Sequence, residues 1–245
     1  MKLFFKALFI FFMPSVLLRC IKTSGFSLGK SSRIGFSYIK SKHIKIGDNC
    51  RIGSLNLIHV NEMLLGKGVF MGSLNIIRGR IRLLLGDKVE IYKQNKISAP
   101  LFNVADTTFF MEPMARIAVG HVFDLTNNIT IGEGSCFAGL GSQVWTHSFY
   151  YSQTSRARVR IDKPVAIGKS CYIGSSVIVC PGATISDGIT IGAGACVSKS
   201  LLKPGLYVSS ALRYIETFDT DEIISKLGES EFYTEYPIYH EKTEP

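Results

Sequence analysis

The sequence lacks the features of several large protein classes. No apolar run approaches the roughly 20 residues that a membrane-spanning helix needs, so a polytopic membrane protein is excluded. The six cysteines form no C-x-x-C pair and no His-rich spacing accompanies them, which argues against a structural zinc site. They are also too sparse for a secreted disulfide framework, and this indicates a reducing compartment. With 46% hydrophobic residues the chain has enough core-forming side chains to exclude global disorder.

Basic residues are almost absent from the C-terminal end. Residues 216–245 contain nine acidic and two basic residues, which gives them a net charge of −7. Since the whole chain has a net charge of +9, residues 1–215 have a net charge of +16. A basic body with an acidic tail suggests an anionic ligand or surface. The basic residues are scattered and no nucleic-acid-binding motif appears, so we expect no nucleic-acid partner.

Residues 1–22 form a separate apolar segment. The stretch 7–18 is apolar and flanked by basic residues, yet it is too short to span a bilayer and no small-residue cleavage site precedes Cys20. Three interpretations remain open: a helix lying in the membrane interface, which we favour, a helix packed on the domain's own surface, and an atypical signal sequence.

Near the C-terminal end, aliphatic residues recur every six positions: Ile167, Ile173, Val179, Ile185, Ile191 and Val197. This period fits neither an α-helix nor the two-residue alternation of a simple strand. It fits a chain that turns a corner every sixth residue, with three sides to each 18-residue coil, and stacked coils make a parallel β-helix. We therefore predict an all-β fold.

The same six-residue phase continues towards the N-terminus, with one interruption. The residues that keep it are Ile161, Phe137, Ile131, Leu125 and Val119, and those that break it are Gln143, Phe149 and Ser155. Because the register agrees on both sides, residues 143–160 are predicted to leave the β-helix as a loop and return in phase. Loops that leave a repeat scaffold often carry function.

The N-terminal half repeats more loosely. One phase is shared by Leu28, Ile34, Ile46, Ile52, Ile58 and Leu64, and it is lost from about residue 66 to residue 118. We expect four regions: the apolar helix 1–22, irregular coils over 23–118, regular coils over 119–207, and a C-terminal region 208–245. The last contains a short amphipathic helix over 217–227 and an acidic tail. Either terminal helix can cover an open end of the coil stack.

Of the five histidines, only His147 lies in the predicted loop. Trp145, the chain's single tryptophan, is two residues away, and Arg156, Arg158 and Arg160 follow. This surrounds an imidazole with aromatic side chains that can form a pocket wall and cations that can hold an anionic ligand.

The run from 164 to 200, PVAIGKSCYIGSSVIVCPGATISDGITIGAGACVSKS, together with the upstream W-T-H, resembles the hexapeptide-repeat acyltransferases. It is similar in particular to the O-acetyltransferases that modify sugars of bacterial surface polysaccharides. The resemblance is tight over 119–205, looser over 25–118 and absent at both ends. It implies a left-handed parallel β-helix, acetyl-CoA as acyl donor, no metal, and a homotrimer with the donor bound between subunits. It also implies that His147 is the general base, which takes the proton of an acceptor hydroxyl.

The resemblance also implies positions for the donor. Ser175, Ala193, Ser198 and Lys199 match the family's coenzyme-binding positions, and Lys199 with Lys203 would pair with its phosphates. The family's G-N-P-A stretch is replaced by Val-Ser-Ser-Ala at 208–211, a departure that affects the adenine contacts.

Other residues are assigned from their chemistry. A base histidine usually has its second ring nitrogen held by a carboxylate or carbonyl, and Asp124 is our candidate for this position. Gln143, Trp145 and Arg156 are candidates for binding the acceptor, because aromatic rings commonly stack on sugars and cations pair with anionic groups.

We therefore expect a transferase that acetylates a sugar hydroxyl of a glycan. The location would be cytoplasmic, with peripheral contact to the inner membrane through residues 1–22. Two alternatives stay open: an acyltransferase using a longer acyl chain or an acyl carrier protein, and a non-catalytic, membrane-attached scaffold. A β-helical carbonic anhydrase would need three zinc-binding histidines, and only His121 and His147 lie in the regular half.

Overall fold

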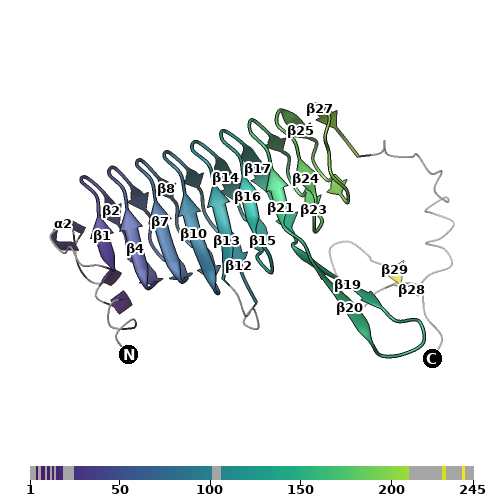
Figure 1. The fold of residues 1–245 in the computed structure, drawn as a ribbon, viewed down its shortest axis with the longest axis horizontal. Coiled ribbons are helices and arrows are strands. Elements are labelled where there is room, and N and C mark those ends of the chain that lie inside the picture. The colour runs from purple at the N-terminus through teal and green to yellow at the C-terminus, as the bar shows by residue number, and fades with distance from the viewer. Residues whose placement is uncertain are drawn as a thin grey trace. The chain divides into compact units, whose positions relative to one another are not determined.

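The computed structural model describes residues 4, 7–8, 10–11, 13, 15–18, 25–100, 106–209, 228–229 and 239–240. The chain divides into two compact units, Met1–Ser209 and Ser210–Pro245. The first unit is a stack of coils with three parallel β-sheets along its sides (Figure 1). In the second unit, β28 (Gly228–Glu229) pairs antiparallel with β29 (Tyr239–His240). The helix predicted over 217–227 lies outside the described residues.

Each coil contributes one short strand to each sheet, and in every sheet the strands pair parallel with those of the neighbouring coils. The first sheet comprises β1 (Phe26–Leu28), β4 (His43–Ile46), β7 (Glu62–Leu65), β10 (Ile81–Leu85), β13 (Thr107–Met111), β16 (Ile129–Ile131), β21 (Val165–Ile167) and β24 (Thr184–Ile185). The second comprises β2 (Arg33–Ile34), β5 (Arg51–Ile52), β8 (Phe70–Met71), β11 (Glu90–Ile91), β14 (Arg116–Val119), β17 (Cys136–Leu140), β22 (Tyr172–Ile173), β25 (Ile189–Ile191) and β27 (Gly205–Tyr207). The third comprises β3 (Tyr38–Lys40), β6 (Leu57–His59), β9 (Ile76–Arg78), β12 (Lys96–Ser98), β15 (Val122–Asp124), β18 (Gln143–Val144), β23 (Ile178–Val179) and β26 (Cys196–Val197).

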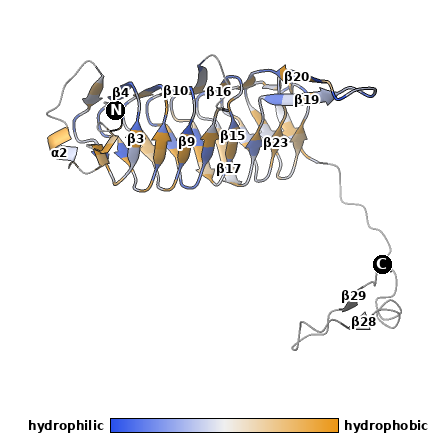
Figure 2. Ribbon diagram, turned by 90° about the horizontal axis from the view of Figure 1, so that it is seen from below, coloured by the Kyte–Doolittle hydropathy of each residue, from blue (hydrophilic) through white to orange (hydrophobic). Residues whose placement is uncertain are grey.

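The hydrophobic core runs down the inside of the coil stack. All six residues of the regular C-terminal phase are buried, and so are Leu125, Ile131 and Phe137 upstream of the loop. Three phenylalanines fill the middle of the stack, where Phe123 packs edge-on against both Phe109 and Phe137. Apolar residues recur on successive coils along the whole stack (Figure 2). The prediction of an all-β parallel solenoid is therefore confirmed.

Coil length varies more than a six-residue repeat allows. Successive strands of the first sheet are offset by 18, 19, 20, 26, 20, 36 and 18 residues. The extra residues shift the inward positions, so that Leu65 is buried in the place where the phase predicted Leu64. Likewise Ile117 is buried in place of Val119. Ile161 lies on β20, outside the coils, so its agreement with the phase was a coincidence.

Polar side chains form a continuous ladder inside one corner of the stack. The backbone N–H of Asn75 donates to Asn56 Oδ1, that of Asn95 to Asn75 Oδ1, and that of His121 to Asn95 Oδ1, each at 2.9 Å. The ladder ends where the Ser142 N–H donates to His121 Nδ1 at 3.1 Å. Since these groups are buried, each rung satisfies backbone donors that the corner removes from water.

The described residues of the N-terminal segment pack on the first coil. Residues 15–18 form a helical turn, α2 (Ser15–Leu18), and Leu18 and Ile10 are buried in the core. Ser15 Oγ accepts from the Ile34 N–H at 2.9 Å. Residues 1–22 are described only in part, and the three interpretations of this segment stay predictions. No helix among the described residues has the length and apolar content to cross a bilayer.

One long insertion interrupts the stack. It is an antiparallel hairpin of β19 (His147–Tyr151) and β20 (Arg158–Asp162), which projects from the side of the coils (Figure 1). The predicted loop began at residue 143, but Gln143 and Val144 belong to β18 and remain in the third sheet. His147 is the first paired residue of the hairpin, at its junction with the stack.

Candidate functional site

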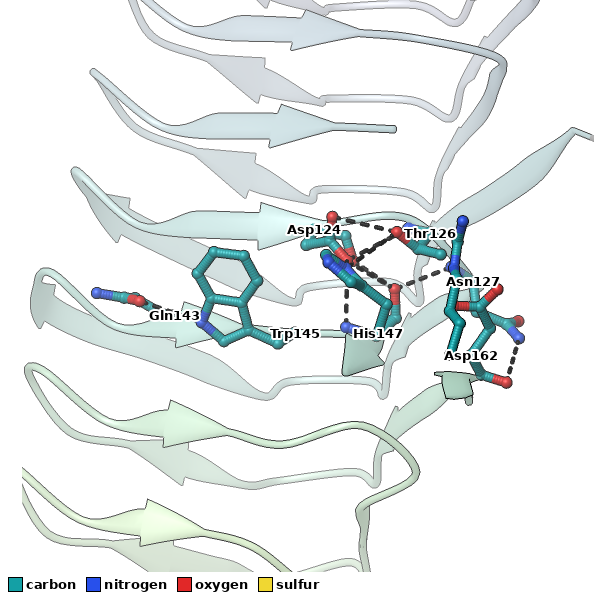
Figure 3. A network of polar contacts seen from close by, with 9 residues as sticks. Asp124, Thr126, Asn127, Gln143, Trp145, His147 and Asp162 are labelled. Carbon is teal, nitrogen blue, oxygen red and sulfur yellow. Dashed lines mark hydrogen bonds and ion pairs between the residues drawn. The ribbon is translucent and has the colours of Figure 1, made fainter. Parts of the chain in front are cut away.

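His147 and Asp124 meet at one edge of the third sheet. Asp124 is the last residue of β15, and His147 begins the hairpin three residues after β18, the next strand of that sheet. His147 Nδ1 lies 2.8 Å from Asp124 Oδ2. Figure 3 shows the imidazole turned towards this carboxylate. The carboxylate therefore holds a hydrogen on Nδ1 and leaves Nε2 as the nitrogen that can accept a proton.

Two threonines fix the carboxylate in place. The Thr146 hydroxyl lies 2.7 Å from the backbone oxygen of Asp124 and 3.1 Å from its Oδ2. Thr126 Oγ1 lies 3.4 Å from Asp124 Oδ1 and 3.1 Å from His147 Nδ1. The Asp124 side chain is only 13% exposed and that of His147 25%. A partly buried, hydrogen-bonded carboxylate of this kind fixes the orientation of the ring.

Aromatic rings border the pair. The rings of Trp145 and Phe149 lie edge-on to the His147 ring, with centroids 6.2 and 5.8 Å away. Trp145 Nε1 donates to Gln143 Oε1 at 3.1 Å, and Figure 3 shows Gln143 on the side of Trp145 that faces away from His147. The structure therefore places Trp145 next to His147 and Gln143 one residue farther out, and their function in acceptor binding stays a prediction.

Arg156 lies elsewhere. It is in the exposed turn between β19 and β20, at the end of the hairpin farthest from His147. Arg158 stacks over the Phe149 ring at 4.6 Å, and Arg160 pairs with Asp162 at 2.7 Å. The three arginines that the sequence places near the histidine thus extend along the hairpin, away from the pair within one chain.

The four donor-binding candidates fall into two groups. Ser198 and Lys199 follow β26 and line a cavity of about 170 Å³ on the last coil. They lie at the same edge of the third sheet as Asp124. Ser175 and Ala193 lie in corners that precede β23 and β26, at the opposite edge of that sheet. One chain therefore does not bring all four together beside His147.

A cavity of about 440 Å³ opens at the His147–Asp124 pair. Its other lining residues come from earlier coils: His59, Arg78, Gly79, Ser98, Ala99 and Pro100. Burial lowers the pKa of His59, and the nearby Lys40 charge lowers it further. This half of the cavity could not be predicted from the sequence, because it belongs to coils in which the six-residue phase is irregular or lost. The pairing register places its residues beside Asp124.

His121, the other histidine of the regular half, takes no part in the site. It is fully buried beside Phe137, and burial lowers its pKa to about 4. Within the described ranges, no group of three or more His, Cys, Asp or Glu side chains is arranged to hold a metal ion.

No family model and no curated protein matches the chain. Among solved structures, the polysialic acid O-acetyltransferase OatWY matches with 16% identity over 84% of this chain and 93% of its own, at a TM-score of 0.39. The polySia-specific acetyltransferase NeuO matches with 19% identity over 81% and 91%, also at 0.39. PerB from Caulobacter crescentus, solved with CoA and GDP-perosamine, matches with 21% identity over 57% of this chain and 56% of its own, at 0.38. At such scores the matches assign no activity, which must be supported by the site's own residues.

Proposed function

We propose that this protein is an acyl-CoA-dependent acyltransferase of the hexapeptide-repeat type, which acetylates a sugar hydroxyl during surface polysaccharide synthesis. The observation that carries the proposal is the His147–Asp124 pair, with Nδ1 held at 2.8 Å by the carboxylate, at the wall of a cavity of about 440 Å³. An imidazole whose second nitrogen is held in this way is equipped for general base catalysis. The hexapeptide pattern adds the family resemblance and its left-handed coil.

In this proposal His147 Nε2 accepts the proton of the acceptor hydroxyl as that oxygen attacks the thioester carbonyl. The new C–O bond forms, the C–S bond of the donor breaks, and the imidazolium returns its proton to the departing thiolate. The products are the acetyl ester and free CoA. Asp124 stabilises the imidazolium, while Thr126 and Thr146 hold the carboxylate in line.

The positions of the donor-binding candidates support a shared site. Ser198 and Lys199 lie at the same sheet edge as Asp124, whereas Ser175 and Ala193 lie across the third sheet. A donor that contacts both groups would have to lie between two copies of the chain, one group coming from each. We therefore propose a homotrimer in which neighbouring stacks form the donor groove, with Lys199 pairing with the donor's phosphates.

The test is acetyl transfer by the full chain from acetyl-CoA to a panel of glycans and nucleotide sugars. The reaction is measured by the release of free thiol and by the mass of the product. His147→Ala should lower kcat/KM by about 10²- to 10⁴-fold, the range of a positioned general base. His43→Ala is the matched control, because His43 is exposed on β4 and distant in register from the pair. Full activity of His147→Ala would contradict the catalytic role and favour a scaffold. If acetyl is transferred only to amino sugars, the acceptor group is an amine and not the proposed hydroxyl.

A further inference from the structure

Side chains at one edge of the third sheet form a column that ends at the proposed base. In the pairing register, Lys40 lies opposite His59, His59 opposite Arg78, Arg78 opposite Ser98, and Ser98 opposite Asp124. Parallel strands are about 4.8 Å apart, so Arg78 lies about 10 Å along the stack from Asp124. His59, Arg78, Ser98 and Asp124 all line the cavity that contains His147.

Arg78 has no carboxylate partner among the described residues, unlike three other arginines of the neighbouring coils. Arg80 pairs with Asp106, Arg82 with Glu62, and Arg116 with Glu90, at 3.1, 2.8 and 2.6 Å. Across the described part of the chain, the Arg78 guanidinium has no ion pair or hydrogen bond. The one carboxylate that shares its cavity, that of Asp124, is already engaged by His147 and two threonines.

The wall beside Arg78 is built from small residues. Gly79 has a φ of +131°, and a Cβ there would come within 2.7 Å of Ala99 Cβ. Gly79, Ser98 and Ala99 leave the backbone accessible along the cavity between Arg78 and the base. His59 adds a hydrogen-bonding ring whose pKa is lowered by partial burial and by the Lys40 charge, and Arg78 is the permanently charged cation among the described lining residues.

We infer that Arg78 binds an anionic oxygen group of the acceptor, a carboxylate or a phosphate, while a separate hydroxyl of the same acceptor reaches His147. A guanidinium presents paired N–H donors that match both groups, and its partner would replace the carboxylate that Arg80, Arg82 and Arg116 have within the chain. Arg78 and Asp124 lie two strands apart, and we therefore assign the charged group and the reacting hydroxyl to different points of the acceptor. Lys40, two strands beyond Arg78, extends the positive column for a longer anionic acceptor.

This inference rests on the proposed acyl transfer, so its test measures binding without any acyl donor. Calorimetric titration of the full chain would use tetragalacturonate for carboxylates, UDP-N-acetylglucosamine for phosphates, and chitotetraose as the neutral probe. The variants are Arg78→Gln, Arg78→Lys, and Arg51→Gln as the control. Arg51 is exposed on β5 in the second sheet and is likewise unpaired among the described residues. Each substitution to Gln therefore removes the same charge from a surface arginine.

The wild-type chain should bind at least one of the two anionic probes more tightly than chitotetraose, and which one it binds distinguishes carboxylate from phosphate. Arg78→Gln should weaken that binding by about tenfold or more, Arg78→Lys by less, and Arg51→Gln by under about twofold. His147→Ala should keep the preference for the anionic probe over chitotetraose, which separates this result from any failure of catalysis. The inference is overturned if Arg78→Gln binds the anionic probes normally, if chitotetraose binds equally well, or if neither anionic probe binds.

Discussion

His121 makes the stability of the fold depend on pH in a defined window. The ring is fully buried, its Nδ1 accepts the Ser142 N–H, and its Nε2 has no hydrogen-bond partner among the described residues. Burial lowers its pKa from the ordinary 6.5 to about 4, and the Gly139 carbonyl offsets only part of that effect. The unfolded chain therefore takes up a proton as the pH falls below about 6.5, whereas the folded chain does so only near pH 4.

The magnitude follows from the two pKa values. Because the unfolded state binds more protons between them, the free energy of unfolding decreases as the pH falls through this window and is unaffected above it. The loss from this one residue should be about 2 kcal/mol at pH 5 and about 3 kcal/mol at pH 4. This is a large share of the 5 to 15 kcal/mol by which folded domains are usually stable.

The measurement is urea unfolding of the full chain and of His121→Asn at pH 7, 5 and 4. Asparagine occupies the three preceding rungs of the ladder, so it fits the backbone pattern and does not titrate. Any packing defect of the variant is the same at each pH, and the carboxylates titrate equally in both proteins. The wild type should therefore lose about 3 kcal/mol more than His121→Asn between pH 7 and pH 4. Parallel pH dependences of the two proteins would refute the reasoning, and His43→Asn, at an exposed site, should behave as the wild type.

Two further predictions concern the site. Asp124→Asn should lower kcat by about 10- to 100-fold, because an amide no longer stabilises the protonated His147 ring. Asp162→Asn, at an exposed hairpin position, is the control and should retain most activity. Equal losses of kcat in the two variants would contradict the positioning role of Asp124. Trp145 is the chain's single tryptophan, is 36% exposed and lies 6.2 Å from His147, so acceptor binding should cover its ring and move its emission to shorter wavelength. The same titration of Trp145→Phe should give no signal, and an unchanged wild-type spectrum at saturating acceptor would place the acceptor elsewhere.

The sequence predicts the regular coils well because one buried aliphatic per side is a strong physical requirement. Ile173, Val179 and Ile185 are buried as the six-residue phase requires. The phase fails where a corner takes an extra residue. Leu55, with a left-handed φ of 61°, lies at such a corner, and the coil that contains it has 19 residues. A fixed period cannot register such an insertion, so Leu64 was predicted to be buried and Leu65 is.

About half of the candidate site could be predicted from the sequence, because the six-residue phase holds only in part of the coil stack. His147 and Asp124 lie in or beside coils whose register can be read from the sequence, and the two side chains do meet. Arg78 and Ser98 lie where the phase is lost, and only the pairing of β9, β12 and β15 brings them to Asp124. Arg156 follows the histidine closely in sequence, but the antiparallel hairpin carries it away. Proximity along the chain was therefore a weaker guide than position within a coil.

The root of the hairpin separates a part of the chain that is fixed by the coils from a part that is not. His147 pairs with Asp162, and the Lys163 N–H donates to the Thr146 oxygen at 2.9 Å, so the insertion is closed where it leaves the stack. A segment closed at its base can lengthen, shorten or change its tip at little cost to the coils below. The His147–Asp124 pair lies on the coil side of that boundary, and Arg156 lies at the far end of the insertion. The arm can therefore change in length or sequence without moving the His147–Asp124 pair.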